Sequence, residues 1–261
     1  MNQAPAVFIS HGAPTFALEP GVLGPNLRAL GASLRDIQAI LVVSPHWQTR
    51  GVQVMTTDVP ATVHDFGGFP RPLYSLHYPA KGAPALAREA AVLLSKSGHA
   101  VTEDSRRGLD HGAWVPLLHL FPDAQVPVFQ VSMPLALDAA SAMQLGKALA
   151  PLRAQGVMII GSGSLTHNLY EFRQMATSPA AYATEFENCV RKAVLTDDAT
   201  GLVNYRELAP HAVRAHPTDE HFLPLLVAMG ARSEGEPAHV IEGGVTHGVL
   251  SMESYAWGVS A

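Results

Sequence analysis

The chain has 261 residues, 48% of them hydrophobic and 15% charged, with a formal net charge of −5 at pH 7. This apolar content is ample for a core, and the negative charge argues against nucleic acid as a partner. The single cysteine, Cys189, leaves no intramolecular disulfide and no thiolate zinc site, and no apolar run approaches the ~18 residues of a membrane helix. We expect a cytoplasmic protein that does not bind membranes.

Strand-like and helix-like segments alternate from the N-terminus onwards. A strand over residues 6–10 is followed by a helix over 22–34, whose leucines recur at helical spacing. Pro127 indicates that 126–131 is an edge strand or that this proline lies among its first residues, and Asp138 is a candidate N-cap for a helix over 138–152. The other expected elements are strands at 39–43, 52–55, 157–160 and 249–257 and helices at 84–95 and 182–195.

This alternation is typical of one fold class. Strands separated by helices of this length favour a single-domain three-layer α/β/α sandwich over residues 1–261, with a mixed, largely parallel central sheet. Apolar helix faces can pack on the sheet or on another subunit, so the sequence fits a monomer and a small homo-oligomer equally.

Three histidines follow expected strands within a few residues. His11 comes directly after the first strand, His46 follows residues 39–43 across a Ser-Pro turn, and His167 follows 157–160 after six residues of turn. The carboxyl ends of parallel strands open into one crevice, so we expect these imidazoles to converge. Three neutral nitrogen ligands with an open position suit catalytic zinc or ferrous iron, and the residues alone leave both metals open.

Two further histidines are expected where helices begin. Asp110 is a candidate N-cap that places His111 at a helix start, and Pro217 indicates a second helix start with His221 in its first turn. The partial positive charge of a helix N-terminus favours neutral imidazole, the form that binds metal. Both histidines are therefore candidate site residues.

The stretch 57–81 has no clear periodicity and is rich in aromatic residues, glycines and prolines. A loop of this length in a compact domain is usually functional, so we expect an ordered pocket wall. The candidate substrate-binding residues within it are His64, Phe69, Arg71 and Tyr74, of which Arg71 is a candidate partner for a substrate carboxylate. Nucleophile-elbow, dinucleotide-binding and phosphate-loop signatures are missing from the sequence, which argues against hydride transfer and nucleotide hydrolysis.

Taken in order, seven short motifs make the chain resemble the class III extradiol ring-cleaving dioxygenases, in the subgroup of 4,5-DOPA dioxygenase extradiol-like proteins. The motifs extend over most of the chain, and their order and separations make the resemblance specific. They are SHGAP at 10–14, SPHW at 44–47, HDFGGFP at 64–70, YPA at 78–80, DHGAW at 110–114, THNL at 166–169 and EHFLPLL at 220–226.

The resemblance implies a role for each of the five histidines. His11, His46 and His221 would hold one divalent metal, His167 would be an acid/base or a fourth ligand, and His111 would contact substrate or the reacting oxygen. The wider class has a carboxylate where this sequence has His221. An all-histidine site carries one less negative charge, which favours Zn²⁺ in purified protein, whereas activity would require Fe²⁺.

The implied reaction inserts O₂ into a small DOPA-like aromatic diol and opens its ring outside the two hydroxyls, giving a muconic semialdehyde. Two other functions suit the same residues. A zinc-dependent hydrolase would work under nitrogen, and a non-catalytic binding protein like the Memo proteins, which share this fold, would turn over nothing with any metal. The aromatic loop, which suits a planar ring, favours the dioxygenase.

Overall fold

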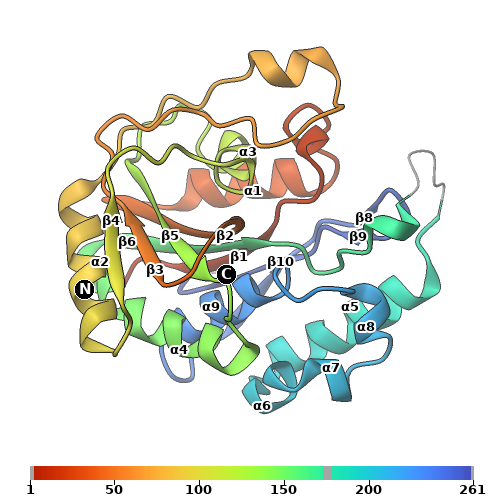
Figure 1. The fold of residues 1–261 in the computed structure, drawn as a ribbon. Coiled ribbons are helices and arrows are strands. Elements are labelled where there is room, and N and C mark those ends of the chain that lie inside the picture. Colours follow the sequence, from red (N-terminus) through yellow and green to blue (C-terminus); the bar gives the residue numbers. More distant parts are fainter. Residues whose placement is uncertain (1–2, 173–177, 260–261) are drawn as a thin grey trace.

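The computed structural model describes residues 3–172 and 178–259, and within these ranges eight strands form one mixed sheet (Figure 1). Its spatial order is β4-β3-β5-β2-β6-β1-β10-β7. A separate small hairpin consists of β8 (Val245–Thr246) and β9 (Leu250–Ser251). The strands of the large sheet are β1 (Ala6–Ser10), β2 (Ala39–Thr49), β3 (Val52–Met55), β4 (Val101–Asp104), β5 (Val128–Pro134), β6 (Val157–Gly163), β7 (Ala238–Ile241) and β10 (Ser254–Trp257).

The centre of the sheet is parallel, and the strands on either side of it, β3 and β10, join it by antiparallel pairs. Strands β5, β2, β6 and β1 run in one direction, whereas β3 and β10 run opposite to β5 and β1. Every residue of β1 and β6 is buried, as expected for strands covered by helices on both faces. The carboxyl ends of β1, β2 and β6 therefore meet at one edge of the sheet.

Helices cover both faces of the sheet, which confirms the predicted three-layer α/β/α fold. On one side lie α1 (Leu23–Ser33) and α3 (His111–Leu120), and on the other lie α2 (Pro84–Lys96), α4 (Ala139–Leu149) and α9 (Leu223–Ala231) (Figure 1). The remaining helices are α5 (Ala181–Leu195), α6 (Ala199–Val203), α7 (Tyr205–Leu208) and α8 (Ala212–Ala215), with 3₁₀ turns η1 (Pro14–Ala17), η2 (Arg71–Ser75), η3 (Ala150–Gln155) and η4 (Leu169–Glu171).

Several expected elements have different bounds, and β2 and β6 extend beyond the expected strands to Thr49 and Gly163. Strand β5 starts after Pro127 and lies inside the sheet between β3 and β2, so the edge-strand alternative is wrong. Asp138 is the N-cap of α4, as predicted, but the α-helix ends at Leu149 and continues as η3, because Pro151 has no amide hydrogen for the helical ladder. The expected strand at 249–257 is divided into β9 and β10.

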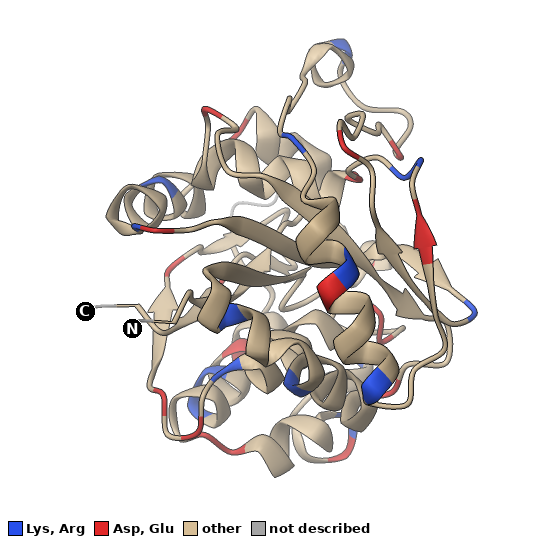
Figure 2. Ribbon diagram, turned by 90° about the vertical axis from the view of Figure 1, so that its left-hand side faces the viewer, with Lys and Arg blue, Asp and Glu red and all other residues tan. Residues whose placement is uncertain are grey.

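The distribution of charge and hydrophobicity fits this layered fold. In the view of Figure 2, acidic and basic residues are interspersed over the peripheral helices and loops. Across the described part of the chain, we find no helix with the length and apolar character needed to span a membrane.

Candidate metal centre

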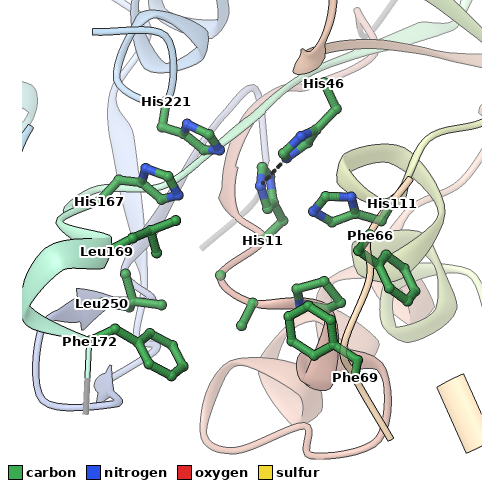
Figure 3. Close-up of a pocket in the computed structure, with 13 residues that line it drawn as sticks. His11, His46, Phe66, Phe69, His111, His167, Leu169, Phe172, His221 and Leu250 are labelled. Atoms are coloured by element: carbon green, nitrogen blue, oxygen red, sulfur yellow. Dashed lines mark hydrogen bonds between the residues drawn. The ribbon is translucent and has the colours of Figure 1, made fainter. Parts of the chain in front are cut away.

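Five histidines meet in a cavity of about 260 Å³ at the carboxyl edge of the parallel strands (Figure 3). In Figure 3 the imidazoles gather at one end of the cavity, and Phe69, Phe172 and Leu250 stand at the other. The histidines come from the ends of separate elements, as the strand-end pattern predicts. They are His11, His46, His111, His167 and His221.

Three of these rings bring their nitrogens together as metal ligands would. His11, His46 and His221 each offer one ring nitrogen, and these atoms lie within 4.8 Å of one another. The Nε2 atoms of His11 and His46 are only 3.1 Å apart (Figure 3). This is hydrogen-bond distance, and a cation bound between the rings would accept both lone pairs in place of that bond, so the donor set fits a metal ion.

A hydroxyl fixes the ring of His11. Ser162 Oγ donates its single proton to the carbonyl of Gly112, so at 3.0 Å from His11 Nδ1 it acts as the acceptor. His11 therefore carries its proton on Nδ1 and presents the Nε2 lone pair to the centre. Burial, reinforced by the neighbouring histidines, lowers the pKa of His11 well below its ordinary value and keeps the ring neutral.

A carboxylate does the same for His221. Its Nδ1 lies 3.0 Å from Glu220 Oε1, which leaves Nε2 as the free lone pair. Among the described residues this buried Nε2 has no hydrogen-bond partner. Burial lowers the pKa of His221 well below its usual range. A buried neutral nitrogen without a partner is costly unless a ligand such as a metal ion fills the place.

Asp65 connects the long loop to two of the histidines. One of its oxygens accepts the His111 backbone amide at 2.9 Å, and the other lies 3.0 Å from His111 Nδ1 and 3.9 Å from His46 Nδ1. Burial disfavours the Asp65 anion, but the hydrogen bonds from His111 outweigh burial and lower the pKa of Asp65 to about 2. One anion therefore orients the imidazole of His111 and faces that of His46.

His167 stands beside the three-nitrogen cluster. Its ring stacks on His221 with centroids 3.5 Å apart and an interplanar angle of 11°. One of its ring nitrogens lies within 4.8 Å of ligand atoms of Glu220 and His221, but it is not part of the set formed by His11, His46 and His221. Burial lowers the pKa of His167 to about 4, so the ring is a neutral proton acceptor at pH 7.

Local backbone structure explains two of these positions. His46 lies inside β2, not in a turn after it, because the strand continues to Thr49 across a register shift with β5 between Val43 and Gln48. Such an irregularity turns a side chain toward the sheet edge. Asp110 is the N-cap of α3, as predicted, with its side chain accepting the Ala113 amide, so His111 is the first helical residue.

The predicted helix start at Pro217 is wrong. His221 lies in a turn before α9, which begins at Leu223 with Pro224 in its first turn. Proline has no amide to donate and suits a first turn, so Pro224 is the proline that marks the start. A Cβ at Gly163 would collide with the His221 carbonyl, and one at Gly161 with the Pro224 carbonyl. These glycines let the His221 turn approach β6 closely.

The structure divides the predicted substrate-binding residues into two groups. Phe69 lines the cavity, but His64, Arg71 and Tyr74 are not among its described lining residues. The His64 ring packs against Trp114 and its Nε2 lies 3.1 Å from the Leu76 carbonyl. His64 and Tyr74 therefore stand behind the wall, with both rings against Phe66. Arg71 is exposed at the start of η2.

Sequence reasoning missed several residues of the site. Phe66 lines the cavity beside Phe69. Asp65 stands one residue earlier, inside a motif that the sequence already singles out. Leu169 also lines the cavity and ends the THNL motif. The others carry no local signal because they are brought in from distant elements, and they are Ser162, Phe172 and Leu250.

A sixth histidine near the centre makes stability depend on pH. His216 is fully buried, its Nε2 donates to the Leu165 carbonyl at 2.8 Å, and burial lowers its pKa from 6.5 to about 3. Below pH 6.5 the unfolded chain binds a proton that the folded chain refuses, so stability is full above pH 6.5 and falls toward pH 3. Between these pH values, protonation of His216 in the unfolded chain lowers the free energy of unfolding by up to about 1.4 kcal/mol per pH unit.

Replacing His216 with leucine is therefore expected to flatten the fall in the free energy of unfolding with pH. Urea unfolding in the presence of a chelator, between about pH 7 and pH 4, measures that slope. The matched control is Leu202→Ala, a buried apolar truncation that lowers stability by a similar amount at every pH. A His216→Leu slope equal to that of the unchanged protein contradicts the prediction.

Comparison with known proteins shows the family to which the chain belongs. Residues 23–256 match a family model described as the catalytic LigB subunit of aromatic ring-opening dioxygenase. The chain belongs to this family of aromatic ring-opening dioxygenases and is an enzyme, which confirms the resemblance seen in the sequence.

Individual relatives match over nearly their full length. The chain is 41% identical over 254 residues to 4,5-DOPA dioxygenase extradiol of Beta vulgaris, covering 95% of this chain and 94% of the relative. It is 41% identical over 259 residues to the protein of the same name from Escherichia coli (strain K12), covering 97% and 94%. The crystal structure of an uncharacterized Escherichia coli K12 protein superposes with a TM-score of 0.81 at 36% identity, covering 97% and 99%.

Proposed function

We propose that this enzyme is a metal-dependent extradiol dioxygenase that opens the ring of a DOPA-like catechol with O₂ and releases a muconic semialdehyde. The observation that carries the proposal is the convergence of three neutral imidazole nitrogens, from His11, His46 and His221, beside a pocket with aromatic walls. The names of the relatives support the catechol substrate.

His11, His46 and His221 would hold one divalent metal, Fe²⁺ for activity, with Zn²⁺ able to take the same nitrogen ligands. When bound, ferrous iron supplies one-electron chemistry that overcomes the spin barrier between a catechol and triplet O₂, and Lewis acidity that lowers the catechol pKa. Ser162 and Glu220 hold two of the ligand rings in the orientation and tautomer that this role requires.

Two histidines would handle protons and charge. His167, neutral at pH 7, accepts a catechol hydroxyl proton on its imidazole and later returns a proton to an oxygen of the opening ring. His111 has its Nδ1 occupied by Asp65, so its Nε2 is left to face the substrate. The contact with Asp65 would hold the ring in one orientation, so that this Nε2 stands beside the reacting oxygen atoms.

The aromatic wall would hold the planar ring and exclude water. Phe66, Phe69 and Phe172 line the cavity with apolar surface, while the histidines supply its polar end. Residues 1–261 would form one catalytic domain. A cytoplasmic location fits a chain with one cysteine, Cys189, which is a free thiol.

Oxygen uptake by metal-stripped protein tests the proposal. The protein is reloaded anaerobically with ferrous iron or with zinc and offered L-DOPA and other catechols. Uptake together with a yellow product, with iron alone, is the expected result. Turnover under nitrogen with zinc would identify a hydrolase instead, and no turnover with any metal would favour a binding protein.

A further inference from the structure

A second cavity, of about 320 Å³, adjoins the histidine cavity. Ala13 lines both. On the opposite side the boundary is a stacked pair, in which the rings of Phe172 and His247 lie 4.3 Å apart at 24° (Figure 3 shows Phe172). Phe172 faces the histidine cavity and His247 faces the second one. A ligand longer than the first cavity would extend past this pair.

Two elements each contribute to both cavities. Pro14, at the start of η1, lines the histidine cavity, and Thr15 beside it lines the second. In the β8–β9 hairpin, Leu250 lines the first cavity and Thr246 and His247 line the second. The two spaces are therefore built as neighbours by the same short segments, and a single molecule could touch both.

The second cavity differs from the first in its chemistry. The lining of the histidine cavity, apart from the imidazoles, is apolar. The second cavity offers the hydroxyls of Thr15 and Thr246, the imidazole of His247 and the carboxylate of Glu19, which is the only formally charged side chain among its described lining residues. Burial lowers the pKa of His247, so the net charge of this space at pH 7 is negative.

His247 is held in an unusual backbone conformation. Its φ is 52°, in the left-handed region that a residue with a Cβ seldom adopts. Residues in this strained region persist where the surrounding structure holds them, and they are enriched at ligand sites. The stack on Phe172 fixes the imidazole at the boundary of the two cavities.

We propose that the second cavity binds the ammonium-bearing substituent of a catechol whose ring lies at the histidine centre. Glu19 pairs with the ammonium group, and Thr15, Thr246 and His247 offer it hydrogen bonds. This inference rests on the proposed function and assigns recognition of the ammonium group to Glu19 and the second cavity. Carboxylate-only catechols gain nothing from Glu19 and are disfavoured by its charge.

Four catechols with different 4-substituents separate the contributions. Dopamine carries the ammonium alone, L-DOPA carries ammonium and carboxylate, dihydrocaffeate carries the carboxylate alone, and 4-ethylcatechol carries neither. In the iron-loaded enzyme we expect kcat/KM to be higher for dopamine and L-DOPA than for the other two. In Glu19→Gln, the ratio of kcat/KM for dopamine to that for 4-ethylcatechol is expected to fall by about 2- to 5-fold, the strength of an exposed ion pair.

A matched variant controls for long-range charge. Glu89→Gln removes the same charge from the exposed surface of α2, and its dopamine ratio should equal that of the unchanged enzyme. An unchanged ratio in Glu19→Gln, or equal losses for all four catechols, would overturn the proposal. Anaerobic equilibrium binding of dopamine and 4-ethylcatechol gives the same ratio without turnover, so failure of the dioxygenase reaction and failure of this second cavity remain distinguishable.

Discussion

Replacing His11 with alanine is expected to abolish both metal binding and oxygen uptake. The variant removes one of three converging nitrogens, and the two that remain, on His46 and His221, do not make a stable site. Because loss of a residue that merely orients a ligand costs about 10- to 100-fold in metal affinity, loss of the ligand itself should cost more than about 100-fold. Metal content after dialysis and oxygen uptake with ferrous iron measure the two effects.

Ser162→Ala provides a graded comparison for that experiment. It leaves all three ligand nitrogens in place and removes the acceptor at His11 Nδ1, together with the hydrogen bond from Ser162 to the Gly112 carbonyl. We expect an affinity loss of about 10- to 100-fold, smaller than that of His11→Ala. If His11→Ala kept one metal ion per chain, the three-histidine assignment would be wrong.

Replacing His167 with alanine is expected to lower kcat by about 10² to 10⁴, the usual contribution of a positioned acid/base. One metal ion per chain should remain, because the His167 nitrogen is grouped with Glu220 and His221 and not with His11 and His46. Added imidazole should restore part of the rate, since the truncation leaves space beside the His221 ring on which His167 stacks.

Metal analysis and turnover together separate the two roles open to His167. Loss of the metal along with activity would make His167 a fourth ligand. Full turnover without it would show that another group accepts the proton. His167→Gln, which keeps a polar side chain of similar length but accepts no proton at neutral pH, should be as slow as His167→Ala and resist rescue by imidazole.

The strand-end histidines were predictable because one rule connects sequence to space. His11 directly follows a buried strand, and parallel strands end at the same edge, so convergence with His167 follows from topology. The N-cap at Asp110 was equally readable, since an acidic residue before an apolar helix satisfies its free amides. These features depend on residues close together in the chain.

Features that depend on distant partners could not be read in this way. The sequence around His46 suggests a turn, but pairing of β2 with β5 extends the strand through it. His64 and Tyr74 have the composition of a binding loop, yet packing against Trp114 and Phe66 places them behind the wall. The helix start was predicted at Pro217, but the chain from 217 to 222 is not helical and α9 begins at Leu223 with Pro224 in its first turn.

The central claim is that this histidine centre inserts O₂ into a catechol ring. Single-turnover reaction of the iron-loaded enzyme with ¹⁸O₂ and a catechol, followed by mass spectrometry, tests it most directly. We predict a ring-opened product with the composition of the substrate plus the two atoms of O₂. One ¹⁸O atom should remain in the new carboxylate, while the aldehyde oxygen exchanges with water. A product that contains no ¹⁸O, because its new oxygen comes from water, would contradict the claim and identify hydrolysis.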